Sequence, residues 1–495
     1  MPRPPVLARA RGLVLLTAAL LAAPASAGLA QTPRLDAATR AKLQRIVDQA
    51  AAKAGIVGAE VSVILGDQRA DFVVGSANVE LKLPMTPETV IQIGSATKTI
   101  NAAMIMTLVE QGKLDLDRPV RTYIPNLRLA DSTAAKAITL RQLLSMSSGL
   151  DNGPYTKFGG GDEELARYVA SLDQLPQAFR PGEGFGYSNA GTSIAGYAAT
   201  LVSGESWDDL IRKRIFEPAG IHHAVTLAQD LPFQRVAVAH NPAAGGKPAT
   251  VRRPWYLTQA QGPAGSTLAM SSHDLASFGG LFISDGKAAD GKQVLSKASV
   301  DAMMTPFVKV FSKAYSEKWG IGLEMEHWSG TPVFGHAGGN ASGASYLKIF
   351  PERKGVLALI TNTPIAFARF TEMIFDGFGA VAFKATRAKL AKPAQPVPVA
   401  DLDRYVGSYA MIGMTYEVTR MGDRLSMKMT SIADGHSTPA GEYSMVALDR
   451  DVFLLESTTG SAPLRDVGFF GHDGKGHAMN LVAPVFAARR VGAGN

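Results

Sequence analysis

The stretch VIQIGSATKTINAAMIMTLVEQGKLDLD, residues 90–117, places a serine and a lysine three positions apart where a short apolar run gives way to a helical pattern. If a helix begins near Ser95, position i+3 returns to the same face, so Lys98 lies beside the Ser95 hydroxyl. The N-terminus of a helix also favours negative charge there. This arrangement is what an activated serine needs, but a chain of this length is expected to contain such a pair by chance.

The same spacing occurs again at Ser345 and Lys348, within the apolar run ASYLKIF of residues 344–350. That run is typical of a strand, in which residues three apart point to opposite faces. The second pair therefore cannot place a lysine on a serine, and Ser95 with Lys98 remains the candidate.

The surrounding regions predict a domain of mixed strands and helices. Residues 36–55 indicate a helix that is capped by Asp36 and ends at Gly55. Two strands, AEVSVIL and ADFVVG, follow across a Gly-Asp turn; further strands are expected within residues 332–363, and a last helix at about 366–386. Strands at both ends, with helical sequence between them, predict one sheet formed by sequence-distant halves.

A proline-rich segment, AKPAQPVPVA at residues 391–400, divides the chain. It should run extended, because proline cannot donate the regular backbone hydrogen bond. Beyond it the short alternating segments YVGSYA, TYEVTR, RLSMKM, MVALDR and DVFLLES indicate an antiparallel β domain. We therefore expect a first domain at residues 28–390, a linker at 391–399 and a β domain at 400–495.

The N-terminus has the three parts of a secretory signal: arginines, the apolar run GLVLLTAALLAA and the small-residue string PASAG. We expect residues 1–27 to be a signal peptide, cleaved after Ala27, and the mature protein to be periplasmic or secreted without a stable membrane anchor. Removal of the three arginines from the formal charge of +7 leaves +4, with dispersed charges, so nucleic acid is not an expected partner. Cysteine is absent, which excludes disulfides, thiolate metal sites and a cysteine nucleophile.

Two further motifs follow the serine. PGEGFGYSNAG, residues 181–191, presents Tyr187, Ser188 and Asn189 in a glycine-rich loop, and FGHAGGNASG presents His336, Ala337 and Gly338 at an expected strand edge. Ser-x-x-Lys, then Tyr-x-Asn, then His-x-Gly in this order resembles the serine β-lactamase and penicillin-binding protein superfamily. The branch it resembles contains class C β-lactamases, D-aminopeptidases, DD-carboxypeptidases and esterases. Three intervening stretches share the similarity: LVEQGKLDLDRPVRTYIP, ITLRQLLSMSSGL and GPAGSTLAMSSHDLASFGGLF.

The resemblance implies an α/β fold with an antiparallel sheet flanked by helices and a helical subdomain, followed by a small lipocalin-like antiparallel β-barrel. It also implies that Ser95 is the nucleophile and that Lys98 and Tyr187 form a coupled pair, either of which could be the base. Asn189 would donate a hydrogen bond to the acyl side chain of the substrate and help to orient Lys98. The backbone N–H groups of Ser95 and Gly339 would form the oxyanion hole.

The third motif departs from the Lys-Thr-Gly of many β-lactamases. His336 is mostly neutral near pH 7 and carries a positive charge only conditionally. With His336 and Gly338 as substrate-binding residues, carboxylate-bearing β-lactams should be favoured less, and small peptides, amides or esters more. Met146 stands where relatives often have histidine, which we interpret as a packing change.

The sequence thus predicts a serine hydrolase of the D-aminopeptidase or DD-carboxypeptidase type, a peptidase or amidase that forms an acyl-enzyme. Alternatives are a carboxylesterase or β-lactamase of the same branch, and a non-catalytic penicillin-recognising binding module. No cofactor is expected, and no metal, because the adjacent His222 and His223 lack a metal-binding spacing. The tail is expected to lean on the first domain and narrow its cleft. The sequence does not indicate the oligomeric state.

Overall fold

The computed structural model describes residue 1 and residues 34–492, except residues 156–157, 162, 254–257, 396 and 459–464. The expected signal peptide at residues 1–27 lies, apart from Met1, outside the described residues. Across the described ranges, no helix is at once sufficiently long and sufficiently apolar to span a bilayer.

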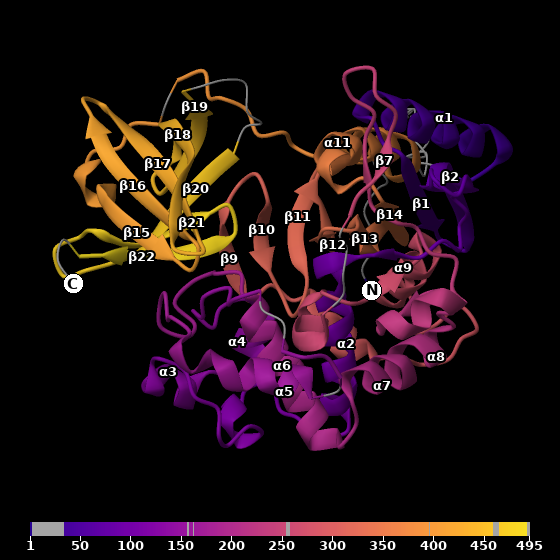
Figure 1. The fold of residues 1–495 in the computed structure, drawn as a ribbon, viewed down its shortest axis with the longest axis horizontal. Coiled ribbons are helices and arrows are strands. Elements are labelled where there is room, and N and C mark those ends of the chain that lie inside the picture. The colour runs from indigo at the N-terminus through magenta and orange to yellow at the C-terminus, as the bar shows by residue number, and fades with distance from the viewer. Residues whose placement is uncertain are drawn as a thin grey trace. The chain divides into compact units, whose positions relative to one another are not determined.

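A nine-stranded sheet organises the first region, and β1 next to β14 joins its sequence-distant halves, with Val61 opposite Leu359 (Figure 1). The expected single sheet is therefore confirmed. In spatial order the strands are β3 (Leu83–Pro84), β2 (Gln68–Asn78), β1 (Gly58–Leu65), β14 (Gly355–Thr361), β13 (Ala344–Phe350), β12 (Thr331–Gly339), β11 (Glu324–Trp328), β10 (Ser316–Trp319) and β9 (Val308–Ser312).

Helices cover both faces of the sheet, so its central strands are buried on both sides. In β14, Leu357 and Leu359 pack in the core with α1 (Ala37–Ala54) and α11 (Phe367–Phe378). The alternate residues of β14 pack in a second core, which includes α2 (Thr97–Glu110) and α9 (Ser272–Gly280). This double burial explains why the strand reads as a continuous apolar run, GVLALIT.

Helix α1 illustrates how local sequence sets an element's ends. The Asp36 side chain accepts a hydrogen bond of 2.8 Å from the Thr39 N–H, and Gly55 takes the left-handed conformation at φ 76°. Leu43, Val47 and Ala50 are buried, as the periodicity predicts. At the other end of the domain, α11 stops at Phe378, short of the expected 386, and a π-helical turn continues to Phe383.

The remaining helices lie between the two halves of the sheet in sequence: α3 (Ser132–Ala137), α4 (Leu140–Leu144), α5 (Glu164–Ala170), α6 (Asn189–Ser203), α7 (Trp207–Ile211), α8 (Glu217–Ala219) and α10 (Lys297–Met304). The same part of the chain contains two short sheets. One has the order β4 (Ile91–Gln92), β8 (Ala269–Met270) and β5 (Ala224–Val225), and the other pairs β6 (His240–Asn241) with β7 (Thr250–Val251).

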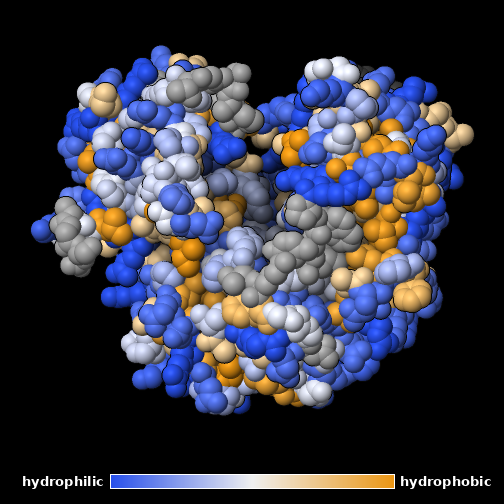
Figure 2. All heavy atoms as spheres, viewed as in Figure 1, coloured by the Kyte–Doolittle hydropathy of each residue, from blue (hydrophilic) through white to orange (hydrophobic). Residues whose placement is uncertain are grey.

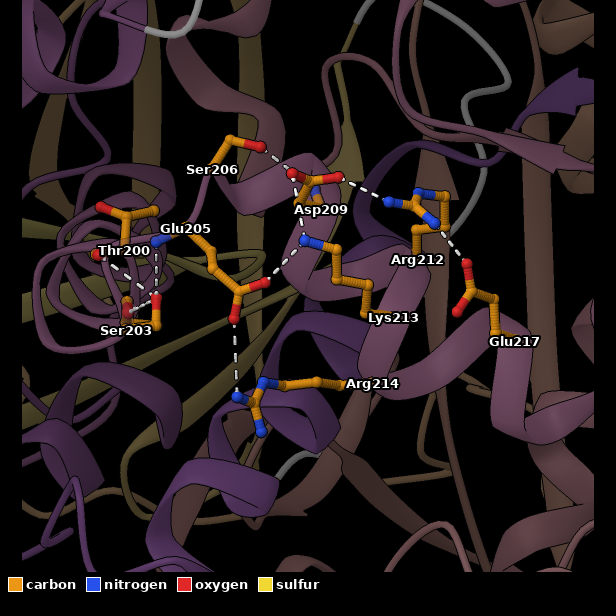
Figure 3. A network of polar contacts seen from close by, with 10 residues as sticks. Thr200, Ser203, Glu205, Ser206, Asp209, Arg212, Lys213, Arg214 and Glu217 are labelled. Carbon is orange, nitrogen blue, oxygen red and sulfur yellow. Dashed lines mark hydrogen bonds and ion pairs between the residues drawn. The ribbon is translucent and has the colours of Figure 1, made fainter.

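A charged network follows α6. Figure 3 shows Asp209 between Arg212 and Lys213, with Nη2 of Arg212 2.7 Å and Nζ of Lys213 3.4 Å from its carboxylate oxygens. Lys213 also contacts Glu205 at 2.8 Å. These side chains are 29–51% exposed to solvent, and an ion pair at a protein surface contributes about 0–1 kcal/mol. The network is therefore a surface feature that contributes little to stability. The face of the molecule shown in Figure 2 is largely hydrophilic.

Eight antiparallel strands close the C-terminal barrel around its own apolar core. They are β15 (Gly407–Met411), β16 (Met414–Met421), β17 (Arg424–Ala433), β18 (His436–Asp449), β19 (Val452–Ser457), β20 (Arg465–His472), β21 (Ala478–Ala483) and β22 (Phe486–Val491). The predicted fold class is confirmed in both parts. The described residues of the expected linker form no helix or strand, and Val397 N–H donates to the Ala447 carbonyl of the barrel at 3.3 Å.

Candidate active site

Ser95 lies in a sharp turn between β4 and the buried helix α2. The turn is a short 3₁₀ segment, Gly94–Ala96, and Gly94 has a φ of 57°. A Cβ on Gly94 would lie 2.4 Å from the Gly339 nitrogen, so only glycine allows both the left-handed backbone and this approach. The turn presents the half-buried Ser95 side chain to a cavity of about 380 Å³.

Lys98 is one helical turn further and is 1% exposed. Its Nζ lies 3.1 Å from Ser95 Oγ and donates a 2.5 Å hydrogen bond to the carbonyl of Ala264. Burial lowers the pKa of the Lys98 amine well below its ordinary value, because a charged ammonium is poorly solvated there. The site therefore favours the neutral amine, which has a lone pair for a proton.

Tyr187 completes the group around Ser95. Lys98 Nζ lies 4.8 Å from the centre of its ring, and interaction with the Ser95 side chain lowers the pKa of its hydroxyl, against the larger effect of burial. Burial raises the pKa of Tyr187 well above its ordinary value, so the phenol stays protonated. The structure thus brings together the three side chains that the motifs predict. Their surroundings favour an unprotonated Lys98 amine and a protonated Tyr187 phenol.

Asn189 is the first residue of α6 and lines the cavity. Its Nδ2 donates to the Tyr155 hydroxyl at 2.7 Å, and its backbone N–H donates to Asn152 Oδ1 at 3.1 Å. The Asn189 Oδ1 is buried and has no hydrogen-bond partner among the described residues. The amide is oriented by Tyr155, and among the described residues no hydrogen bond joins it to Lys98.

The third motif lies at the end of β12. Pairing with β11 stops at Gly335, whereas pairing with β13 continues to Gly339, so the last residues of β12 form a free edge towards the serine turn. A Cβ on Gly338 would lie 1.8 Å from the Ile93 carbonyl oxygen. Gly338 therefore permits the close approach that brings the Gly339 backbone beside Ser95, where the oxyanion hole is expected.

His336 differs from the expected substrate-binding position. Its side chain is fully buried, with its ring 5.2 Å from that of Trp319 and 6.1 Å from that of Tyr187. Burial, together with Lys98, lowers its pKa to about 3, so the imidazole is neutral. In β12 successive side chains alternate between faces, and this one points into the core beneath Tyr187. His336 lies behind the reacting groups, away from the cavity wall.

Most of the described residues that line the cavity have polar side chains, but none of them is acidic or basic. Beside Ser95 the lining includes four amides, Gln92, Asn189, Gln261 and Asn340, and the hydroxyl of Tyr155. All the described residues that line the cavity precede the linker. The sequence predicts that the barrel narrows the cleft, but no described barrel residue lines this cavity.

Tyr155 and the Ala264 carbonyl were not predicted as site groups. Ala264 lies within a stretch that carries the family resemblance, but a backbone carbonyl has no signature of its own. Tyr155 follows Asn152 in a loop whose position depends on Asn189, about 35 residues away in sequence, and only the folded chain joins them.

Comparison with known proteins identifies the family. A family model described as Beta-lactamase matches residues 43–373. Penicillin-binding protein 4 of Amycolatopsis lactamdurans is 32% identical over 361 residues, which cover 72% of this chain and 94% of the relative.

Solved structures are similar in fold. SurE crystallised with D-Leu has a TM-score of 0.74 at 24% identity, covering 92% of this chain and 100% of SurE. D-amino acid amidase from Ochrobactrum anthropi SV3, complexed with L-phenylalanine amide, has a TM-score of 0.56 at 23% identity, covering 68% and 98% of the two chains. The chain described here belongs to the β-lactamase family of serine hydrolases, which includes penicillin-binding protein homologues.

Proposed function

We propose that this protein is an exported peptidase or amidase that cleaves small substrates through an acyl-enzyme on Ser95, in the manner of D-aminopeptidases and DD-carboxypeptidases. The observation that carries the proposal is the 3.1 Å contact between Ser95 Oγ, which faces a cavity, and the buried Lys98 amine.

In acylation, Ser95 Oγ attacks the substrate carbonyl carbon while its proton passes to the neutral Lys98 amine. The negative charge that develops on the carbonyl oxygen is stabilised by the backbone N–H groups of Ser95 and Gly339. One such donor contributes about 2.7–4 kcal/mol to the transition state. The leaving amine takes a proton from the Lys98 ammonium, directly or through the Tyr187 hydroxyl, and departs.

Hydrolysis of the acyl-enzyme reverses the proton path. A water molecule attacks the ester carbon while its proton passes to the Lys98 amine, directly or through the Tyr187 hydroxyl, and Ser95 Oγ then leaves as the free hydroxyl by taking a proton from the Lys98 ammonium. The pKa directions support Lys98 as the acceptor in the resting state, with Tyr187 as a proton donor and conduit.

The polar cavity wall supports amides over β-lactams. Asn189 lines the cavity beside Ser95, where its side-chain amide can bind the amide group of a peptide or amide substrate. Neither the neutral His336 nor the described wall offers a fixed cation for the carboxylate of a β-lactam. The D-configuration is proposed from the names of the structural neighbours, one crystallised with D-Leu and one a D-amino acid amidase. Export is proposed from residues 1–27.

A serine-directed fluorophosphonate tests the nucleophile. The wild type should be labelled, Ser95→Ala should not, and Ser408→Ala, which changes an exposed barrel serine, should behave as wild type. Equal labelling of the wild type and Ser95→Ala would exclude the proposed chemistry. Assays with D- and L-amino acid amides, D-Ala-D-Ala peptides, p-nitrophenyl esters and nitrocefin would then rank substrates, and we expect the highest kcat/KM for a D-amide or D-peptide.

A further inference from the structure

The turn between β21 and β22 of the barrel reaches the loop that carries Tyr187. Its Val485 carbonyl accepts a 3.0 Å hydrogen bond from the Tyr187 N–H. The next residue, Phe486, places its ring 5.8 Å from the Tyr187 ring at 88°, an edge-to-face contact. One barrel turn therefore contacts both the backbone and the side chain of Tyr187.

Close packing fixes the same loop against the barrel wall. A Cβ on Gly184 would lie 2.2 Å from the Phe470 ring, and one on Gly186 would lie 2.9 Å from the Ala487 Cβ. Gly184 and Gly186 thus allow the loop to lie directly on β20 and β22. Buried residues from both parts form one apolar cluster here, including Phe185 and Trp319 of the first region and Phe470 and Val482 of the barrel.

A second barrel turn supports the other end of the motif. The Ile412 N–H, between β15 and β16, donates to Asp151 Oδ2 at 3.0 Å. The Asp151 backbone carbonyl in turn accepts from Ser188 Oγ at 2.8 Å, and Ser188 caps the helix that begins with Asn189. The Tyr-x-Asn motif is therefore held from the barrel on both sides.

The surroundings of the Tyr187 ring show what the barrel adds. Trp319 and His336 contact it from the sheet, at 5.9 and 6.1 Å between ring centres, and Lys98 lies over its face. Phe486 is the neighbouring ring that comes from the barrel. With it in place, Tyr187 is 6% exposed, and its ring lies 4.8 Å from the Nζ of Lys98, which in turn contacts Ser95 Oγ.

We propose that the β21–β22 turn is a positioning element for Tyr187, so that the C-terminal barrel is a working part of the active site rather than an independent module. The inference rests on the proposed function of Ser95, Lys98 and Tyr187. The Val485 carbonyl sets the backbone of Tyr187, and Phe486 limits the ring to the orientation in which its hydroxyl meets Ser95. A misplacement of about 1 Å can cost about 10²-fold in rate.

Variants of Phe486 test the positioning role in the full-length protein. In Phe486→Ala, kcat on the best amide substrate and the fluorophosphonate labelling rate should fall about 10- to 100-fold, while KM changes little, because the cavity wall is untouched. Phe486→Leu, which keeps most of the volume, should recover part of the rate. Gly186→Ala, which adds a methyl group against Ala487, should lower kcat in the same way.

Phe311→Ala is the matched control. Phe311 belongs to the same interface, where its ring stacks on that of Phe470 at 5.0 Å, and its ring is not among the described aromatic rings that pair with Tyr187. This variant should lower the thermal unfolding midpoint about as much as Phe486→Ala but keep kcat near the wild-type value. If Phe486→Ala and Gly186→Ala lose only thermal stability, as the control does, the barrel is a stabilising module and the inference is wrong.

Hydrogen–deuterium exchange separates this inference from the proposed function. The Tyr187 N–H should exchange faster in Phe486→Ala than in the wild type and remain protected in Phe311→Ala. A wild type that is not labelled at Ser95 would overturn the proposed function, yet the exchange comparison would still decide whether the turn holds Tyr187. Unchanged exchange in Phe486→Ala and Gly186→Ala would overturn the positioning role whatever the activity.

Discussion

Lys98 and Lys348 are both about 1% exposed, but their partners give them opposite properties. Lys348 Nζ lies 2.7 Å from Glu324 and 2.5 Å from Glu326, and these carboxylates raise its pKa although burial opposes them. Lys98 contacts a hydroxyl and a carbonyl, and burial lowers its pKa. A buried lysine beside carboxylates remains a cation, whereas one beside neutral groups becomes a base.

This difference predicts the pH dependence of acylation. The Lys98 amine accepts a proton only when it is unprotonated, so the labelling rate should fall as the pH decreases through its lowered pKa, at a pH well below the ordinary lysine value of 10.5. Lys98→Met, similar in length and uncharged, should remove this acidic limb and lower the rate about 10²–10⁴-fold. The rate of fluorophosphonate labelling measured against pH checks both effects.

Lys354→Met, which changes an exposed lysine in the turn after β13, provides the control and should keep the wild-type profile. His336 is not expected to produce the limb, because its pKa of about 3 lies below the working range. An acidic limb that persists in Lys98→Met would assign the base to another group.

At the scale of elements, the site depends on the end of β12 touching the serine turn. Gly338→Ala would place a methyl group 1.8 Å from the Ile93 carbonyl oxygen and 2.9 Å from the Ala96 nitrogen, both of them backbone atoms that cannot rotate away. β12 must then move from the turn, and the Gly339 N–H moves with it. We expect kcat to fall about 10²–10³-fold, as for loss of one oxyanion-hole donor.

Gly280→Ala, at the end of α9, is a suitable control because the nearest atom to its added Cβ lies 3.7 Å away. Steady-state kinetics on the best substrate, with circular dichroism to verify folding, compares the two variants. A folded Gly338→Ala enzyme with wild-type kcat would show that this contact does not set the oxyanion hole.

At the scale of the whole molecule, a buried carboxylate joins the barrel to the sheet. Asp466 of β20 is 1% exposed and accepts hydrogen bonds from Ser312 Oγ at 2.7 Å, from the Ala314 N–H at 3.2 Å and from the Lys313 N–H. Figure 1 shows β20 and β9 as neighbours at this junction. The interface between the barrel and the first region therefore contains a buried polar contact at Asp466 as well as the apolar cluster described above.

Removal of this carboxylate should weaken the whole fold. Asp466→Ala leaves the donors at the end of β9 without their acceptor, and an unsatisfied buried donor costs about 1–3 kcal/mol. We expect the free energy of unfolding to fall by about that amount in denaturant titrations, whereas Asp423→Ala, at an exposed barrel turn, should be nearly neutral. Equal stability of Asp466→Ala and the wild type would indicate that the two parts unfold independently.

Much of the fold could be read from local patterns. The Asp36 cap, the Gly55 stop and the strand at residues 344–350 depend on neighbouring residues, and the structure has them where the sequence predicts them. The family resemblance could be recognised from the order of the three motifs, because recognising a motif needs only residue types and their spacing. The structure brings Ser95, Lys98 and Tyr187 together as expected.

Other features arise only when distant segments meet. The side chain of His336 could face substrate or core, and the packing of Trp319 and Tyr187 decided for the core. Asn189 gained Tyr155 as its partner, and Tyr187 gained Val485 and Phe486 from a barrel almost 300 residues later. Local sequence determined which residues form helices, strands and motifs, because those depend on nearby backbone and side-chain interactions. Tertiary structure decided burial, and with it the pKa of each group, because desolvation depends on every segment that packs around a side chain.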